Sequence, residues 1–341
     1  MASKPKILLI YTGGTIGMVK DYKTGALRAF NFDKLLKNIP ELRLLECEIS
    51  TASFEEPIDS SNMNPDYWSQ LCDFIATDYK DYQGFVVLHG SDTMSYTASA
   101  LSFMLENLGK PVIFTGSQLP IGDLRTDAKE NLITAVQLAS LCKRGKPLIQ
   151  EVCLYFEYKL YRANRTTKVS AEHFEAFDSP NYTPLVTSGV HLDVNEEALF
   201  RPGRKTFTVH KNLERNVLLL KMHPGISESM VCAMLGIEGI KGVLIETYGS
   251  GNTTTKPWFI AAVKKTIKKG IPIVNVTQCT SGHVQMGNYE TSVGLKKAGV
   301  ISGSDLTTEA ALAKMMYLLG QELDAKVFKS IFETSLRGEL S

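Results

Sequence analysis

The stretch Tyr11-Thr12-Gly13-Gly14-Thr15-Ile16-Gly17 is the most informative part of the chain, and it directly follows the apolar residues 7–10. A short apolar, β-branched run of this kind is typical of a buried strand. Glycine tolerates positive φ and has no Cβ, so two adjacent glycines let the backbone approach a ligand closely. We therefore predict a glycine loop at a strand end that presents Thr15 as a nucleophile.

The same loop is also compatible with a phosphate cradle or a plain tight turn, which are the commoner uses of such loops. However, the dinucleotide-binding fingerprint requires glycine where this chain has Thr12, and no Gly-Lys-Ser or Gly-Lys-Thr follows. The loop alone leaves these alternatives open.

Outward from this loop, short apolar runs alternate with stretches of helical spacing. We expect strands at residues 7–11, 85–88, 112–115 and 152–156, and helices at residues 65–77, 94–107 and 127–143. This alternation predicts a parallel sheet flanked by helices. Ligands of such sheets bind beyond the carboxyl ends of the strands. The side chains expected at this edge are Thr15, Ser91, Asp92, Ser117 and Gln118.

The chain has 341 residues, more than one hydrophobic core usually supports. Residues 196–215 are rich in charge and lack a sustained period, after which an α/β pattern restarts with strands at 217–221, 243–247 and 273–277 and helices at 256–269 and 308–319. We predict an N-terminal domain over residues 1–195 that carries the catalytic residues, a linker over 196–215, and a smaller α/β C-terminal domain over 216–341.

Composition narrows the class of partner. The formal net charge is +1, which gives no electrostatic reason to expect nucleic acid or an anionic membrane. The six cysteines include no Cys-x-x-Cys pair, and the histidines show no metal-ligand spacing. The first residues lead into an apolar run too short for a signal peptide. We expect a cytoplasmic protein that acts on a small molecule without a metal or other cofactor.

A second motif, Leu88-His89-Gly90-Ser91-Asp92-Thr93-Met94, places a hydroxyl and a carboxylate at the next expected strand end. Alone, Ser and Asp here would most simply cap the following helix. Together with the glycine loop, the motif resembles the paired signatures of the bacterial-type L-asparaginases, nearest to their cytoplasmic type I branch. Further matches are Asp59-Ser60-Ser61, residues 96–113, Thr115-Gly116-Ser117-Gln118, Tyr161-Arg162, residues 164–168 and Thr277-Gln278-Cys279.

The resemblance implies hydrolysis of the side-chain amide of L-asparagine to L-aspartate and ammonia through a threonine acyl-enzyme. It assigns the nucleophile to Thr15 and a proton relay to Ser91, Asp92 and Lys168. A threonine hydroxyl needs a base within reach and donors for the developing oxyanion. Lys168 accepts a proton only as a neutral amine, which burial favours and a neighbouring Asp92 disfavours. The sequence leaves the balance between these two effects open.

The resemblance also implies how a free amino acid is held. Asp92 pairs with the substrate ammonium, and Asp59, Ser60 and Ser61 border its carboxylate. From the residues alone, Asp59 and the serines could equally form a turn and a helix cap. The family forms homodimers, often paired into homotetramers, in which Asn252 would reach into the site of a neighbouring subunit.

Two departures from the family concern the catalytic residues. Ser91 stands where threonine is usual, so the hydroxyl remains but the methyl that restricts χ1 is lost. The tyrosine expected after the nucleophile is replaced by Ala26, with Tyr22 nearby in a different register. Residues 18–28 are polar and contain a glycine, so we expect a lid from which Tyr22 could activate Thr15. A surface position for Tyr22 is the alternative.

A third departure concerns regulation. Type I members can carry an asparagine-responsive site near the positions of Thr167 and Cys279, where an arginine is expected. This chain has Glu246 there, and an anion would repel a substrate carboxylate. The sequence leaves open whether allosteric regulation survives this replacement.

Other functions remain open at this stage. One methylene in a substrate is worth only about 1–3 kcal/mol in a pocket, so a glutaminase-asparaginase is the nearest enzyme alternative. The ammonia-releasing subunit of an archaeal-type transfer-RNA amidotransferase is another, although the chain has no basic stripe. Ser91 and the missing tyrosine favour a third alternative, a regulator that binds asparagine or aspartate without catalysis.

Overall fold

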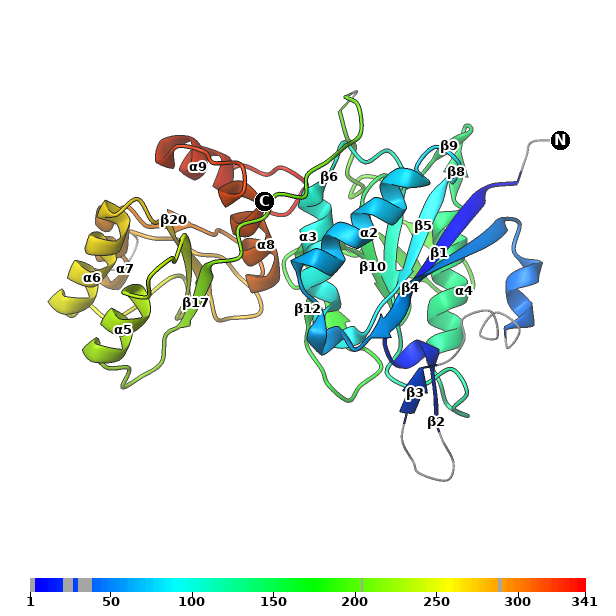
Figure 1. The fold of residues 1–341 in the computed structure, drawn as a ribbon, viewed down its shortest axis with the longest axis horizontal. Helices are drawn as coiled ribbons and strands as arrows, with labels where there is room; N and C mark the ends of the chain where they lie inside the picture. Colours follow the sequence, from blue (N-terminus) through cyan, green and yellow to red (C-terminus); the bar gives the residue numbers. More distant parts are fainter. Residues whose placement is uncertain (1–3, 21–26, 30–38, 204, 288–289) are drawn as a thin grey trace. The chain divides into compact units, whose positions relative to one another are not determined.

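The computed structural model describes residues 4–20, 27–29, 39–203, 205–287 and 290–341 (Figure 1). The chain divides into two compact units, residues 1–211 and residues 212–341. The domain limits of the sequence analysis, with a linker over 196–215, stay a prediction. Within the first unit, Ala198 and Leu199 of that segment are buried in the core.

The first unit is built on one eight-stranded sheet with the order β15-β14-β11-β10-β7-β5-β1-β4. The five strands from β10 to β4 run parallel, and β11, β14 and β15 extend the sheet in antiparallel fashion. The strands are β1 (Lys6–Gly13), β4 (Glu48–Ile58), β5 (Gly84–Leu88), β7 (Val112–Thr115), β10 (Val152–Phe156), β11 (Lys159–Arg162), β14 (Val186–Ser188) and β15 (Leu192–Val194).

Short strands form four small antiparallel pairs beside the main sheet. They are β2 (Met18–Lys20) with β3 (Leu27–Ala29), β6 (Leu105–Glu106) with β16 (Thr208–Val209), β8 (Cys142–Lys143) with β9 (Lys146–Pro147), and β12 (Thr167–Lys168) with β13 (Phe177–Asp178).

Helices cover both faces of the sheet, as the near-continuous apolar strands require (Figure 1). Alternate residues of β1, including Ile7 and Leu9, share a core with α4, whereas α2 and α3 pack against each other. The helices are α2 (Pro65–Thr77), α3 (Met94–Met104) and α4 (Ala128–Ala139), with the 3-10 turns η1 (Thr15–Gly17), η2 (Pro40–Leu44), η3 (Ser60–Asn62), η4 (Ser91–Thr93) and η5 (Ala163–Arg165).

Two helices are shorter than predicted. α3 ends at Met104, because the next two residues form β6 and pair with β16. α4 ends at Ala139, and residues 142–147 form the β8–β9 hairpin. Arg144 and Gly145 at its turn both have positive φ, a conformation that a helix cannot contain.

The second unit contains a smaller, fully parallel sheet with the order β17-β18-β19-β20. Its elements are β17 (Val217–Lys221), α5 (Glu228–Leu235), β18 (Gly242–Thr247), α6 (Pro257–Lys268), β19 (Ile273–Thr277), α7 (Glu290–Ala298), β20 (Ile301–Ser302), α8 (Thr308–Leu319) and α9 (Ala325–Phe332). The predicted fold class is therefore confirmed: a mainly parallel α/β sheet in the larger unit and a parallel α/β sheet in the smaller one. Among the described residues, no helix has the length and apolarity needed to cross a membrane.

Candidate active site

The glycine loop after β1 has the backbone geometry that its sequence predicts. Gly13 has φ +132° and Gly14 has φ +88°. A Cβ on Gly13 would overlap the backbone of Ile58 at the end of β4, and a Cβ on Gly14 would lie 2.5 Å from the Cα of Gly90 after β5. Only glycine lets three strand ends meet so closely. Thr15 follows as the first, half-buried residue of η1.

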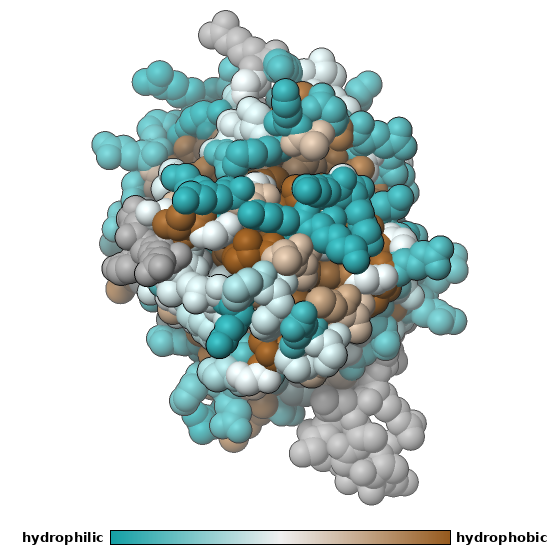
Figure 2. Space-filling view, turned by 90° about the vertical axis from the view of Figure 1, so that its left-hand side faces the viewer, coloured by the Kyte–Doolittle hydropathy of each residue, from teal (hydrophilic) through white to brown (hydrophobic). Residues whose placement is uncertain are grey.

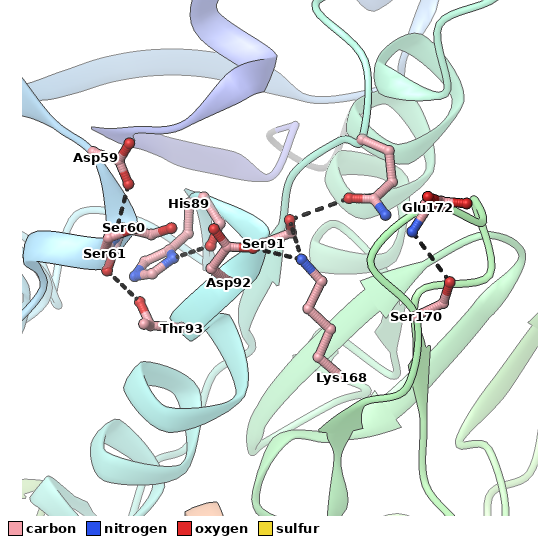
Figure 3. A network of polar contacts seen from close by, with 12 residues as sticks. Asp59, Ser60, Ser61, His89, Ser91, Asp92, Thr93, Lys168, Ser170 and Glu172 are labelled. Atoms are coloured by element: carbon pink, nitrogen blue, oxygen red, sulfur yellow. Dashed lines mark hydrogen bonds and ion pairs between the residues drawn. The ribbon is translucent and has the colours of Figure 1, made fainter.

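Lys168, Ser91 and Asp92 form one connected group at this edge of the sheet (Figure 3). Lys168 Nζ donates to Ser91 Oγ at 2.9 Å and to Asp92 Oδ1 at 2.6 Å. The Asp92 side chain is 64% exposed and that of Lys168 is 19% exposed. The predicted members of the relay are thus in contact, and one side of the group is open to solvent.

Ser91 does not serve as a helix cap. Gly90 is the N-cap residue of η4, and Thr93 is the N-cap residue of α3. Neither of these two helices has a capping hydrogen bond from a side chain. The Ser91 hydroxyl is directed instead to Lys168 and to Gln118 Oε1, which lies 3.2 Å away. This hydroxyl is therefore available for proton transfer rather than committed to the backbone.

Asp59 and Ser60 lie beside the second motif, in two different settings (Figure 3). Asp59 caps η3 by accepting from the backbone N–H of Ser61 at 2.8 Å, and this hydrogen bond lowers the pKa of the Asp59 carboxyl. Ser60 is buried, and its carbonyl oxygen accepts from Thr93 Oγ1 at 2.8 Å. The turn-and-cap interpretation therefore describes Asp59, while Ser60 packs directly against the residues that lead into Ser91.

His89 is a residue of the second motif to which the sequence analysis gave no role. It is fully buried, its ring meets Phe114 edge-on, and its Nδ1 donates to the Gly90 carbonyl at 2.7 Å. Burial lowers the pKa of the His89 imidazole to about 4. A neutral histidine thus supports the turn that carries Ser91. The sequence signal was the place of His89 between an apolar strand and the predicted catalytic residues Ser91 and Asp92.

Tyr22 and Ala26 fall outside the described residues, so the lid and the catalytic role of Tyr22 stay predictions. Asn252 belongs to the second unit, where its Oδ1 accepts from Thr291 Oγ1 at 2.8 Å. Among the described residues, no group of three His, Cys, Asp or Glu side chains is placed to hold a metal ion.

Glu246, which replaces the arginine of the family's regulatory site, is buried in the second unit. Its carboxylate accepts from Thr308 Oγ1 at 2.6 Å and pairs with Lys221 Nζ at 3.1 Å. Both carboxylate oxygens are therefore engaged within the unit.

The glycine loop before Thr15 meets the backbone of Gly90, and the hydroxyl of the next residue, Ser91, is in contact with Lys168. Hydroxyl side chains and a lysine at one edge of a sheet are the equipment of a hydrolase that proceeds through nucleophilic attack by a side chain. Comparison with known proteins shows which family of hydrolases the chain resembles. Residues 6–200 match the model of the asparaginase N-terminal domain, and residues 216–332 match that of the glutaminase/asparaginase C-terminal domain. The chain belongs to the asparaginase family. The predicted family and the predicted enzyme class, an amidohydrolase, are confirmed.

Individual relatives resemble the chain over its whole length. L-asparaginase 1 of Escherichia coli K12 is 42% identical, covering 99% of this chain and 98% of its own. A 60 kDa lysophospholipase of Mus musculus is 41% identical, covering 100% of this chain and 63% of its own. The crystal structure of L-asparaginase I from Vibrio cholerae superimposes with a TM-score of 0.90 at 40% identity, covering 99% of each chain.

Proposed function

We propose that this protein hydrolyses the side-chain amide of L-asparagine to L-aspartate and ammonia. The observation that carries the proposal is the contact of Lys168 with both Ser91 and Asp92, at the sheet edge where the glycine loop presents Thr15. Membership of the asparaginase family supports the same reaction.

The chemistry divides into two acyl transfers. The Thr15 hydroxyl oxygen attacks the amide carbon of asparagine, the C–N bond breaks, and the nitrogen leaves as ammonia with the proton that Thr15 gave up. Water then attacks the resulting ester, which releases aspartate and returns a proton to Thr15. We assign the transfer of these protons to Ser91 and Lys168, and the hydrogen bond between their polar atoms supports this assignment.

Substrate recognition in this proposal uses the charges of a free amino acid. The exposed carboxylate of Asp92 pairs with the substrate ammonium, and the hydroxyl groups of Ser60 and Ser61 border its carboxylate. The Asp59 carboxylate holds the turn of these serines through the N–H of Ser61. Tyr22 is proposed to assist Thr15.

We also propose that the protein is a homodimer or homotetramer and is cytoplasmic. Apolar side chains interrupt the hydrophilic surface in the space-filling view (Figure 2). Exposed apolar residues of the second unit include Leu219, Met230 and Ile237. Exposed apolar surface of this kind suits a subunit contact, from which Asn252 would reach a neighbouring site.

The test is ammonia release from L-asparagine and L-glutamine by the purified protein over a wide range of concentrations. We expect release from asparagine with a hyperbolic response, much slower release from glutamine, and loss of release in Thr15→Ala. Comparable rates with the two amides would instead identify a glutaminase-asparaginase, because one methylene changes binding by only about 1–3 kcal/mol.

The non-catalytic alternative, a regulator that binds asparagine or aspartate, has a distinct signature. Ligand binding to the folded state raises the melting temperature even when no reaction occurs. Thermal stabilisation by asparagine without ammonia release would support the regulator and contradict the proposed hydrolysis.

A further inference from the structure

Gln118 connects two loops that supply the proposed relay. Its Oε1 lies 3.2 Å from Ser91 Oγ, and its Nε2 lies 3.1 Å from the backbone carbonyl oxygen of His173. Ser91 follows β5, whereas His173 lies in the loop after β12, the short strand that ends with Lys168. One side chain therefore joins the segment that carries the hydroxyl to the segment that carries the lysine.

The partners of Gln118 allow only one orientation of its amide. The His173 carbonyl oxygen can only accept, so the NH₂ group of Gln118 must face it. The amide oxygen then faces Ser91, and the Ser91 hydroxyl must donate to it. The Ser91 proton is thereby directed to Gln118, so in the contact with Lys168 the lysine Nζ donates and Ser91 Oγ accepts. Ser91 is thus held by two hydrogen bonds of opposite sense.

These bonds matter because serine is intrinsically freer than threonine. A γ-methyl group restricts χ1, and Ser91 has none. Without other constraints its hydroxyl could turn away from Lys168 at little cost. We propose that Gln118 is a positioning residue of the reaction, which fixes the Ser91 hydroxyl towards Lys168 and so supplies the constraint that a γ-methyl would otherwise give. The inference rests on the proposed function, because it assigns Gln118 to the same relay.

The backbone around Gln118 is itself firmly held. The buried Asp127, directly before α4, accepts from the backbone N–H groups of Gln118 at 2.9 Å and Leu119 at 3.1 Å. Asn131 of α4 donates to the carbonyl oxygen of Gly116 at 3.1 Å. The Gln118 side chain therefore starts from a fixed point, as a residue that positions another must.

The partner loop is ordered by a turn of its own. Ser170 Oγ accepts from the backbone N–H of Glu172 at 3.2 Å (Figure 3). It also accepts from the backbone N–H of His173 at 2.9 Å. This turn fixes the His173 carbonyl that receives the Gln118 amide. The backbone at Gln118 and the backbone at His173 are thus each held by hydrogen bonds that do not involve the Gln118 side chain.

The experiment compares Gln118→Met, which keeps the length of the side chain but removes both hydrogen bonds, with the control Gln150→Met. Gln150 is also half-buried and donates to a backbone carbonyl, that of Pro147, in the segment before β10. Steady-state kinetics with L-asparagine are measured for both variants and for Gln118→Met combined with Ser91→Thr. Melting temperatures show that each variant is folded.

We expect Gln118→Met to lower kcat about tenfold with KM nearly unchanged, the effect of losing one oriented hydrogen bond. Gln150→Met should match the parent, and Ser91→Thr should restore most of the lost kcat in the Gln118→Met background. Parental kcat in Gln118→Met, or no rescue by Ser91→Thr, would overturn the inference while leaving the proposed function intact. Absence of ammonia release from the parent protein would overturn both.

Discussion

Two lysine–carboxylate pairs in this protein have similar geometry and opposite surroundings. Lys168 Nζ lies 2.6 Å from Asp92 in the first unit, and Lys314 Nζ lies 2.5 Å from Glu339 in the second. Both side chains of the second pair have zero exposure, whereas the Asp92 side chain is 64% exposed. Lys314 also donates to the Thr334 carbonyl at 2.7 Å.

The difference in burial distinguishes an ion pair that stabilises the fold from one to which we assign a part in the reaction. Glu339 further accepts from the backbone N–H groups of Leu336 and Arg337, so the buried pair fastens the end of the chain to α8. Burial lowers the pKa of Lys314, and Glu339 opposes this shift. The open pair at Lys168 instead leaves a carboxylate and a hydroxyl accessible to a substrate. Two predictions test this distinction, and two more compare buried and exposed residues of the same type.

The variant Lys168→Met should have the largest effect, and we expect that effect on activity. Loss of a group that transfers protons lowers rates by about 10²–10⁴-fold. The free energy of unfolding should change by less than about 1 kcal/mol, because exposed ion pairs contribute little. Ammonia release and urea unfolding measure the two quantities. A variant with normal kcat would exclude Lys168 from the relay.

Lys314→Met should show the opposite behaviour. Removing one partner leaves the Glu339 charge buried, which costs about 3–5 kcal/mol of unfolding free energy. The double variant Lys314→Met with Glu339→Gln should recover part of this loss, because no buried charge remains. Urea unfolding checks the prediction, and kcat per folded protein should stay near the parental value. A loss below 1 kcal/mol would show that the pair contributes little.

A smaller effect is expected from two histidines that follow parallel strands. Both His89 and His223 place Nδ1 near the carbonyl oxygen of the next residue, but His89 is buried and His223 is exposed. Burial lowers the pKa of His89 from 6.5 to about 4. In the unfolded chain, His89 is therefore protonated below pH 6.5. In the folded protein it stays neutral down to about pH 4. Stability from this residue is complete above pH 6.5 and falls as the pH drops towards 4.

Urea unfolding between pH 7 and pH 4 gives the free energy of unfolding that tests this prediction. The parent should lose about 3 kcal/mol more than His89→Asn over this range. His223→Asn is the matched control and should follow the parent. Equal pH dependence in His89→Asn and the parent would contradict a buried, neutral His89.

The smallest expected effect compares Gly14→Ala with Gly225→Ala. The two glycines have φ of +88° and +89°, but an added Cβ at Gly225 meets no atom within 4 Å. Gly225→Ala should lose only the cost of a left-handed backbone, about 1–2 kcal/mol. Gly14→Ala adds overlap with the Gly90 backbone and should lose about 1–3 kcal/mol more. Equal losses of unfolding free energy would show that the strand ends can separate.

Much of the fold could be predicted because its signals are local. The helix at residues 65–77 and the strand at 217–221 have the predicted bounds, since both depend on short-range periodicity. The edge strand β4 was missed because its burial pattern is mostly exposed and polar, without an apolar run. The antiparallel strands β14 and β15 were also missed, because three-residue strands carry little pattern.

The sequence by itself determined the strand-end glycine loop, because positive φ at Gly13 and Gly14 follows from the absence of a Cβ. It also determined the family, through motifs whose residue types suit nucleophilic hydrolysis. Only the tertiary structure decided which polar groups meet. Ser91 and Lys168 are 77 residues apart and Ser91 and Gln118 are 27 apart, yet their polar atoms are in hydrogen-bond contact. The Ser91–Gln118 contact depends on the pairing of β5 with β7, and the Ser91–Lys168 contact depends on where β12 packs beside the main sheet. Both are properties of packing that no local pattern encodes.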